Sequence, residues 1–378
     1  MPSPPNRRHE PLTPLTILHV TEAMGGGTES AIREFAAATH LDHHHILFRA
    51  RNDSASQAGF DEFNTAVSVQ AGIIGLRRAI GSRVAQLRPD VVHLHSSWAG
   101  LLGRAFARRE GLPGIVYSPH CFYFERRDAG ASRRWAAREI ERSLSRNTDV
   151  VVAVSPHEAS LARKLGNTDT YFVRNLLRGW AAPSPAPRSH GDLPTIVTVG
   201  RVSRQKDPAF YLAAVKSARR LGVDANWVWI GGGEDGDTRR LRENGIHVTG
   251  WLDRNEARDR LADASLYVHT AAWESGPISI EEARLAGVPT VIRSIPPLIS
   301  LGFPAGIDTP EQMAKAIAIE LQRPAAASAA SPDGPHHRDV ELEAQSNELR
   351  RAYVAAATLA GLRLDRAKEE LARKASDA

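Results

Sequence analysis

Two glutamates, Glu274 and Glu282, lie on either side of a glycine–proline turn that follows the apolar segment 264–273. Glycine and proline let the backbone turn tightly into the helix predicted after them. The first turn of a helix has unpaired N–H groups and the positive end of the helix dipole, and both favour an anion such as a pyrophosphate. We therefore expect an anion site here, formed by Gly276, Pro277, Ile278 and Ser279.

Two basic residues, Arg201 and Lys206, follow another apolar segment, at residues 195–199. Placed on one loop, they can converge on a single diphosphate, the guanidinium as a planar fork and the ammonium as a point charge. They would neutralise the charge of a departing diphosphate. Basic residues after a strand are common by themselves. Their order relative to Glu274 and Glu282 makes the functional interpretation the stronger one.

Three consecutive glycines, Gly25, Gly26 and Gly27, follow the first apolar segment of the chain. Because glycine has no side chain, a phosphate or an acceptor can approach the backbone closely there. A single glycine-rich turn is a weak signal, since many α/β units have one as a plain tight turn. The residues do not spell G-x-G-x-x-G, which argues against a dinucleotide cofactor.

Short apolar segments alternate with amphipathic ones along most of the chain. The pattern predicts parallel sheets covered by helices on both faces. The expected strands are 15–21, 45–48, 91–95, 114–118, 150–154, 195–199, 227–230, 246–249, 266–269 and 290–292. The expected helices are 28–40, 79–87, 99–108, 131–146, 208–221, 238–243, 254–264 and 279–286.

We divide the chain into two Rossmann-like, doubly wound α/β domains, at 1–182 and 195–335. The proline-rich stretch 183–194 is the expected linker, and 336–378 is a charged helical tail for which packing back on the first domain is one option. Two such domains place a substrate cleft between the carboxyl ends of their sheets.

Together these motifs resemble the retaining enzymes of glycosyltransferase family 4, the group 1 type, over residues 15–300. The resemblance implies the GT-B fold, in which two Rossmann-like domains face each other across a cleft. It places Glu274 beside the donor sugar and Glu282 on the ribose hydroxyls. His120, at the end of the strand 114–118, matches the family's histidine near the donor sugar, although a structural histidine is the alternative.

The resemblance gives two sets of site residues. The expected catalytic residues are His120, Arg201, Lys206 and Glu274. The expected contacts of the nucleotide and donor are Gly25, Gly26, Gly27, Arg201, Lys206, Trp251, Leu252, Glu274, Gly276, Pro277, Ile278, Ser279 and Glu282. The chain departs from the family at Ser275, where glycine is usual, and after Ile292, where a glycine-rich Asp-Gly segment is missing.

The implied activity is transfer of a sugar from a nucleoside diphosphate, by default uridine diphosphate, to an acceptor hydroxyl with retention of configuration. A bacterial surface polysaccharide or a lipid-linked oligosaccharide is the expected acceptor. We expect no cofactor and no obligatory metal. The alternatives are transfer to a secondary metabolite, nucleotide-sugar 2-epimerisation, which needs no acceptor, and a non-catalytic nucleotide-sugar-binding scaffold.

The composition of the chain indicates the cellular compartment and the kinds of partner to expect. Cys121 is the only cysteine, so no intrachain disulfide can form and a reducing cytoplasm fits. We find neither a signal peptide nor a run of about 18 apolar residues. The net charge of +5 is too diffuse to indicate nucleic acid. The helix expected at 131–146 gives a basic stripe, Arg127, Arg134, Arg138 and Arg142, opposite Ala137, Ile140 and Leu144. This stripe offers peripheral contact with an anionic membrane at the inner face, or simply a solvated face.

Other histidines and aspartates give weaker signals. Asp235 and Asp237 spell D-x-D, but we interpret them as a loop and helix cap. The histidines at 40 and 43–45 have no partnering cysteine or carboxylate pattern, so we interpret them as solvated and not as metal ligands. The role of His93 and His95 on one strand stays open.

Overall fold

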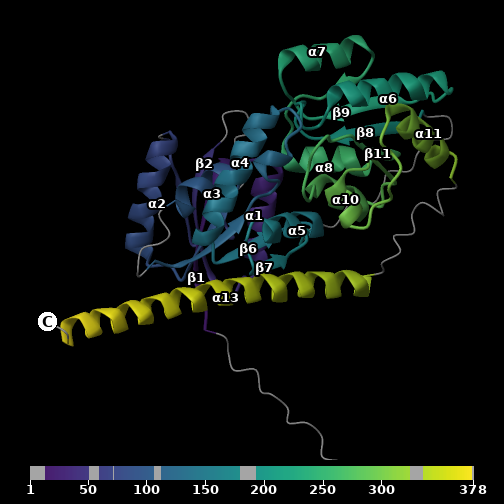
Figure 1. The fold of residues 1–378 in the computed structure, drawn as a ribbon. Helices are drawn as coiled ribbons and strands as arrows, with labels where there is room; N and C mark the ends of the chain where they lie inside the picture. Colours follow the sequence, from purple (N-terminus) through teal and green to yellow (C-terminus); the bar gives the residue numbers. More distant parts are fainter. Residues whose placement is uncertain are drawn as a thin grey trace, which may run out of the picture.

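The computed structural model describes residues 13–50, 59–70, 72–105, 112–178, 193–323 and 335–376. These residues form two parallel sheets, each flanked by helices, and the parts around the two sheets contact each other. One long helix crosses back over the first sheet (Figure 1). We call the parts around the first and second sheets the N-terminal and C-terminal domains.

The N-terminal sheet has seven strands in the order β3-β2-β1-β4-β5-β6-β7, all paired in parallel. Its strands are β1 Thr16–Met24, β2 His43–Ala50, β3 Thr65–Ser68, β4 Val91–His95, β5 Gly114–Ser118, β6 Val150–Ala153 and β7 Thr170–Phe172. Its helices are α1 Gly26–Ala38, α2 Ile73–Leu87, α3 Ser97–Arg104, α4 Ala131–Leu144 and α5 Pro156–Lys164. Strands β4, β5 and β6 are buried at every position, which in β4 includes His93 and His95.

The C-terminal sheet has five parallel strands in the order β10-β9-β8-β11-β12. Its strands are β8 Thr195–Val199, β9 Asn226–Ile230, β10 His247–Val248, β11 Leu266–His269 and β12 Thr290–Ile292. Its helices are α6 Pro208–Arg220, α7 Asp235–Glu243, α8 Arg254–Ala262, α9 Ile278–Leu285, α10 Pro296–Ser300 and α11 Pro310–Leu321. In both sheets the strand order reverses direction beside the first strand, which is the doubly wound arrangement predicted from the sequence.

Two strands of the N-terminal sheet were not predicted. Both β3 and β7 are short edge strands, and none of their residues is fully buried. A short, exposed strand has no apolar run to reveal it. Most of the predicted linker 183–194 lies outside the described residues, as does 324–334, so the predicted domain boundaries stay a prediction.

The helical tail forms one helix, α13 Pro335–Ser376, which lies along the N-terminal sheet (Figure 1). It buries Leu349, Ala352, Tyr353 and Ala356 in the same core as β5 and β6. The helix approaches β5 so closely that a Cβ atom at Gly114 would lie 2.4 Å from the carbonyl oxygen of Ala356. The tail therefore belongs structurally to the N-terminal domain.

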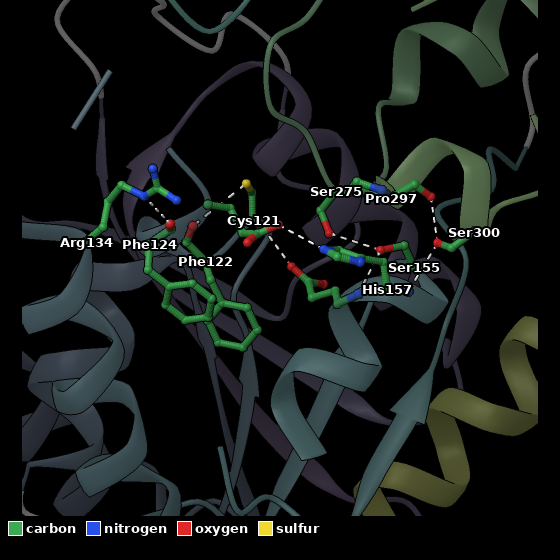
Figure 2. A network of polar contacts seen from close by, with 11 residues as sticks. Cys121, Phe122, Phe124, Arg134, Ser155, His157, Ser275, Pro297 and Ser300 are labelled. Carbon is green, nitrogen blue, oxygen red and sulfur yellow. Dashed lines mark hydrogen bonds and ion pairs between the residues drawn. The ribbon is translucent and has the colours of Figure 1, made fainter. Parts of the chain in front are cut away.

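Direct contacts join the two domains. The Asn175 side-chain amide donates to the carbonyl oxygen of Gly276 at 2.7 Å, and the backbone N–H of His157 donates to Ser300 Oγ at 3.1 Å. Figure 2 shows Ser155 and Ser275 facing each other between the domains, with their hydroxyl oxygens 3.4 Å apart. Loops at the carboxyl ends of the two sheets thus meet. Among the described helices, none is both long and apolar enough to cross a membrane.

Candidate functional site

The loops that carry the predicted site residues follow strands of both sheets. In the N-terminal domain they follow β1 and β5, and in the C-terminal domain they follow β8, β10 and β11. Because all these strands are parallel, the loops gather at the carboxyl ends of the two sheets, where open α/β folds bind ligands.

Lys206 and Glu274 form an ion pair in the C-terminal domain. Lys206 Nζ donates to Glu274 Oε1 at 2.5 Å, and the side chains are only 16% and 13% exposed. Thr270 Oγ1 donates to the carbonyl oxygen of Lys206 at 2.7 Å, and the backbone N–H of Ala272 donates to that of Gln205 at 2.8 Å. These bonds hold the two loops together, so a cation and a carboxylate stay adjacent with little solvent around them.

Arg201 lies on the same loop, with its guanidinium carbon 5.7 Å from the ring centroid of Trp251. Trp251 is half exposed, whereas Leu252 packs against the core below α9. The loop begins at Gly200, where φ is +132° and a Cβ atom would lie 2.8 Å from Lys206 Cε. A glycine here therefore lets the lysine side chain fold back toward Glu274.

Glu282 lies on α9 and accepts a hydrogen bond from Arg258 Nε at 3.0 Å, with both side chains 12% exposed. Arg254, one turn earlier on α8, lies in the same charged group, and burial and then Arg258 lower its pKa. Neither arginine was predicted as a site residue from the sequence. Their i, i+4 spacing places them on one face of α8, but nothing in the motif indicates that this face meets Glu282.

The start of α9 carries the predicted anion site. Pro277 precedes the first helical residue, Ile278, and Ser279 Oγ lies 2.8 Å from the hydroxyl of Tyr267. Gly276 contacts the N-terminal domain, where a Cβ atom would meet Val154 and Asn175 at 3.1 Å. This helix start therefore faces the junction of the two domains.

The glycine turn leads into α1, which begins at Gly26 without a side-chain cap. Gly25 and Gly26 have φ of +147° and +58°, which other residues adopt only with strain. A Cβ atom at Gly26 or Gly27 would meet no described atom within 4 Å. Packing therefore does not require glycine at Gly27, and the first turn of α1 lies beside open space.

His120 follows β5, and its Nε2 lies 3.0 Å from Nδ1 of His95. Burial lowers the pKa of His120 to about 4, so the imidazole is neutral near pH 7. His120 and Cys121 both have positive φ, at 50° and 90°. The Glu158 carboxylate holds this turn by accepting from the backbone N–H groups of Cys121 at 2.7 Å and of Val154 at 2.8 Å.

The turn at His120 borders the C-terminal domain. A small hollow between the domains is lined by Cys121, Glu158, Glu274 and Ser275. Figure 2 shows Cys121 in the polar network that also contains Ser275 and His157. The structure thus brings the end of β5 next to the loop of Glu274, although these residues lie far apart in the sequence.

A larger cavity of about 540 Å³ opens between the domains beside the loop that carries Arg204 and Asp207. Residues from both domains line it, among them Arg127, Asp128, Arg204, Asp207 and Trp273. The interpretation of Asp235 and Asp237 as a loop and helix cap was wrong, because both lie within the first turn of α7, which follows Glu234 and has no side-chain cap.

One histidine prediction was wrong. His44 was predicted to be solvated, but it is only 2% exposed and lies 3.0 Å from a ring nitrogen of His19. Alternation along β2 places His44 on the same buried face as Ile46 and Phe48, which is the signal that the sequence contained. The basic stripe was also misplaced in part, since Arg127 precedes α4 and Ile140 is 47% exposed.

Family models match both domains. Residues 26–175 match the model described as a glycosyl transferase 4-like domain, and residues 193–323 match that of the glycosyl transferases group 1. The two matches divide the chain as the two sheets do.

Relatives and solved structures agree with these matches. The chain is 25% identical over 308 residues to an uncharacterized 41.2 kDa protein in the cps region of Klebsiella pneumoniae, covering 76% of this chain and 84% of the relative. It is 26% identical over 230 residues to the UDP-Gal:alpha-D-GlcNAc-diphosphoundecaprenol alpha-1,3-galactosyltransferase of Escherichia coli, covering 54% of this chain and 58% of that enzyme. Sucrose-phosphate synthase from Thermosynechococcus elongatus superposes with a TM-score of 0.67 at 16% identity, covering 94% of this chain and 100% of that one. The chain therefore belongs to the group 1 glycosyltransferases of family 4 and is an enzyme of the GT-B fold.

Proposed function

We propose that this glycosyltransferase moves a sugar from a nucleoside diphosphate, with uridine as the expected base, to a hydroxyl group of a lipid-linked or polysaccharide acceptor. The observation that carries the proposal is the partly buried ion pair of Lys206 and Glu274, beside Arg201 and facing the turn at His120. The Escherichia coli relative, whose name gives a UDP-galactose donor and a diphosphoundecaprenol acceptor, supports this choice.

The charges suit a departing diphosphate. An ammonium has three donors, and Glu274 takes one from Lys206, which leaves two for phosphate oxygens. Arg201 and the start of α9 supply further donors and positive potential. Stabilising a leaving group in this way is electrostatic catalysis by groups that are already in place. Because these cations provide the compensating charge, we propose that no metal is obligatory.

We propose retention of configuration at the anomeric carbon. In this scheme the acceptor hydroxyl attacks from the side of the departing diphosphate, and the Glu274 carboxylate stabilises the positive charge that develops on the sugar. Glu282 and Arg258 would bind the ribose hydroxyls between them, since a carboxylate accepts and a guanidinium donates.

The test begins with calorimetric titration of the protein with UDP, GDP and ADP in EDTA. Binding of one nucleotide supports the proposal and selects the donor for turnover assays with and without a lipid-linked acceptor. Nucleotide release without any acceptor would instead favour the epimerase, and no binding even with magnesium would contradict the proposed donor site. NMR of the product linkage then distinguishes retention from inversion.

We also propose that α4 brings the enzyme to an anionic membrane that carries the acceptor, at the cytoplasmic face. Trp135 on α4 is 67% exposed and Ile140 is 47% exposed, and Arg133, Arg138 and Arg142 are exposed around them. Exposed aromatic and aliphatic side chains among arginines are typical of helices that lie in the headgroup region of a bilayer.

A further inference from the structure

Four histidines of the N-terminal domain form a continuous hydrogen-bonded chain behind the proposed site. His120 Nε2 lies 3.0 Å from His95 Nδ1, and His95 Nε2 lies 3.0 Å from His19 Nδ1. His19 Nε2 lies 3.0 Å from His44 Nδ1, and His44 Nε2 lies 2.9 Å from the carbonyl oxygen of Thr39. The chain runs from the end of β5 through β4 and β1 to β2.

The end of the chain at Thr39 fixes which nitrogens carry protons. A carbonyl oxygen only accepts, so His44 must donate through Nε2. Burial lowers the pKa of His44, His19 and His95, so each ring is neutral and has one N–H. His44 Nδ1 must therefore accept from His19 Nε2, and the same reasoning passes along each ring in turn.

The last ring in the chain is His120. It must donate through Nε2 to His95 Nδ1, which leaves its own Nδ1 unprotonated. No described residue hydrogen-bonds to His120 Nδ1, and the side chain is only partly buried. Because the two nitrogens of an imidazole point away from each other, Nδ1 is directed away from His95.

A fifth histidine, His93, belongs to a separate chain. Ser118 Oγ donates to the carbonyl oxygen of Val152 at 2.9 Å, so it accepts from His93 Nε2, and the hydroxyl of Tyr353 donates to His93 Nδ1. His19, His93 and His95 lie close enough together to suggest a metal site. However, each of their ring nitrogens already has a hydrogen-bond partner, so the cluster is better explained as two polarised chains.

We propose that His95, His19 and His44 are positioning residues that hold His120 with its Nδ1 as a hydrogen-bond acceptor for a hydroxyl group of the sugar substrate. This inference rests on the proposed function, and it adds a requirement on the substrate. A hydroxyl group has a hydrogen to donate to Nδ1, whereas a carboxylate or phosphate oxygen has none. The hydrogen-bonded series of histidines thus selects a sugar hydroxyl over an anionic substituent at Nδ1 of His120.

Aromatic rings packed against the series of histidines help to hold it in place. The ring of Phe35 on α1 stacks on His93, with centroids 5.8 Å apart, and lies 6.3 Å from that of His120. His95 and His120 stack with an interplanar angle of 17°. Hydrogen bonds in such a series polarise one another, so reversing one link favours reversal of the others.

The experiment is NMR of protein labelled with nitrogen-15 in histidine, with the His120 signals assigned by their loss in His120→Asn. In the unsubstituted protein without ligand, we expect His120 Nε2 to be protonated and Nδ1 to be unprotonated. A protonated Nδ1 would overturn the proposal without any variant having to fold, and independently of whether the enzyme binds a nucleotide.

The second arm uses His44→Phe, which changes the fourth histidine of the series, three rings from His120. This change leaves His19 Nε2–H without an acceptor, so we expect the chain to reverse and a protonated Nδ1 to appear at His120. His93→Phe is the matched control, because His93 is equally buried beside the chain but is not a member of it. An unchanged tautomer in folded His44→Phe, or the same change in His93→Phe, would overturn the proposal.

Kinetics distinguish positioning from general damage. We expect kcat/KM for the sugar donor to fall about tenfold in His44→Phe, the equivalent of one good hydrogen bond. The dissociation constant of UDP should not change, because the charged groups proposed to bind UDP, Arg201, Lys206 and Glu282, lie in the other domain. Loss of UDP affinity in His44→Phe would indicate global damage and contradict a positioning role, whereas a protein that never binds UDP contradicts the proposed function and leaves the NMR result standing.

Discussion

Arg201 is the proposed nucleotide contact that is simplest to test. The loop also carries Arg204, which is exposed and lines the cavity outside the Lys206–Glu274 pair. Because Arg201 can bond the diphosphate through two charged hydrogen bonds, Arg201→Ala should weaken UDP binding by about 10- to 100-fold. Calorimetry measures this, with Arg204→Ala as the control, and equal affinities in the two variants would remove Arg201 from the site.

Glu274 should matter for the chemical step more than for binding. Glu274→Gln keeps the shape of the side chain and removes the charge that we assign to stabilising the sugar in the transition state. We expect kcat to fall by about 100-fold or more. The dissociation constant of UDP should rise by less than about threefold, which single-turnover kinetics and calorimetry measure separately. A variant with nearly unchanged kcat would contradict the role of the carboxylate.

At the scale of single elements, the contact between α13 and β5 is tight enough to predict a stability change. In Gly114→Ala the new methyl group would lie against the backbone of Ala356 at 2.4 Å, so the helix or the strand must shift. We expect the free energy of unfolding to fall by about 1–3 kcal/mol, the usual cost of overpacking.

Gly361 supplies the opposite case on the same helix. It has open space around its Cβ position, so Gly361→Ala should raise the free energy of unfolding by about 0.5–1 kcal/mol through helix propensity alone. Denaturation in urea measures both variants. If Gly114→Ala proved as stable as the unsubstituted protein, α13 would not be docked on β5 as described.

The membrane proposal is tested on α4. Trp135→Ser removes the single tryptophan of α4, and we expect binding to vesicles of anionic phospholipid to weaken about tenfold. Trp98→Ser is the control, because Trp98 is 50% exposed on α3. Sedimentation with vesicles of neutral and of anionic lipid gives the affinities, and equal loss in both variants would contradict a specific role of α4.

The elements show which parts of the fold a sequence reveals. Strands β4, β5, β8, β11 and β12 begin and end where their apolar runs predict, because both faces of each are covered. The Arg201 loop and Glu274 could be predicted because each lies next to such a strand. The partner of Glu282 could not, since Arg258 reaches it only through the packing of α8 on α9.

The histidine chain shows the same limit more clearly. Its members come from β1, β2 and β4 and from the turn after β5, and the spatial order of these strands differs from their order in the chain. His19 lies opposite His93 in the pairing of β1 with β4, and a shift of one residue would turn it to the other face. Register of this kind is set by tertiary packing and cannot be obtained from spacing in one sequence.

At the scale of the whole molecule, buried histidines should make the protein sensitive to acid. Burial lowers the pKa of seven histidines below the ordinary value of 6.5, in one case to about 4; they are His19, His44, His45, His93, His95, His120 and His269. As the pH falls through about 6.5, the unfolded chain takes up protons that the folded protein excludes. Stability is therefore greatest above about pH 6.5 and decreases toward pH 4.

Two buried carboxyl groups oppose this trend. Burial raises the pKa of Glu34 and Glu158, so the folded protein keeps their protons at a pH where the unfolded chain has lost them. Their contribution is lost as the pH rises, which is opposite in sign to that of the histidines. Since the histidines are more numerous, the free energy of unfolding should still decrease between pH 6.5 and pH 4.5.

The slope of the free energy of unfolding against pH gives the number of protons that the unfolded chain binds in excess of the folded protein. Each buried neutral histidine adds about 1.4 kcal/mol per pH unit once the unfolded chain is protonated. His95→Phe should therefore reduce the slope by about that amount between pH 5.5 and 4.5, as measured by urea denaturation at each pH. Val92→Ala, also buried on β4, should lower stability equally at every pH and leave the slope unchanged. If His95→Phe left the slope unchanged as well, His95 would not be a buried neutral member of the chain that positions His120.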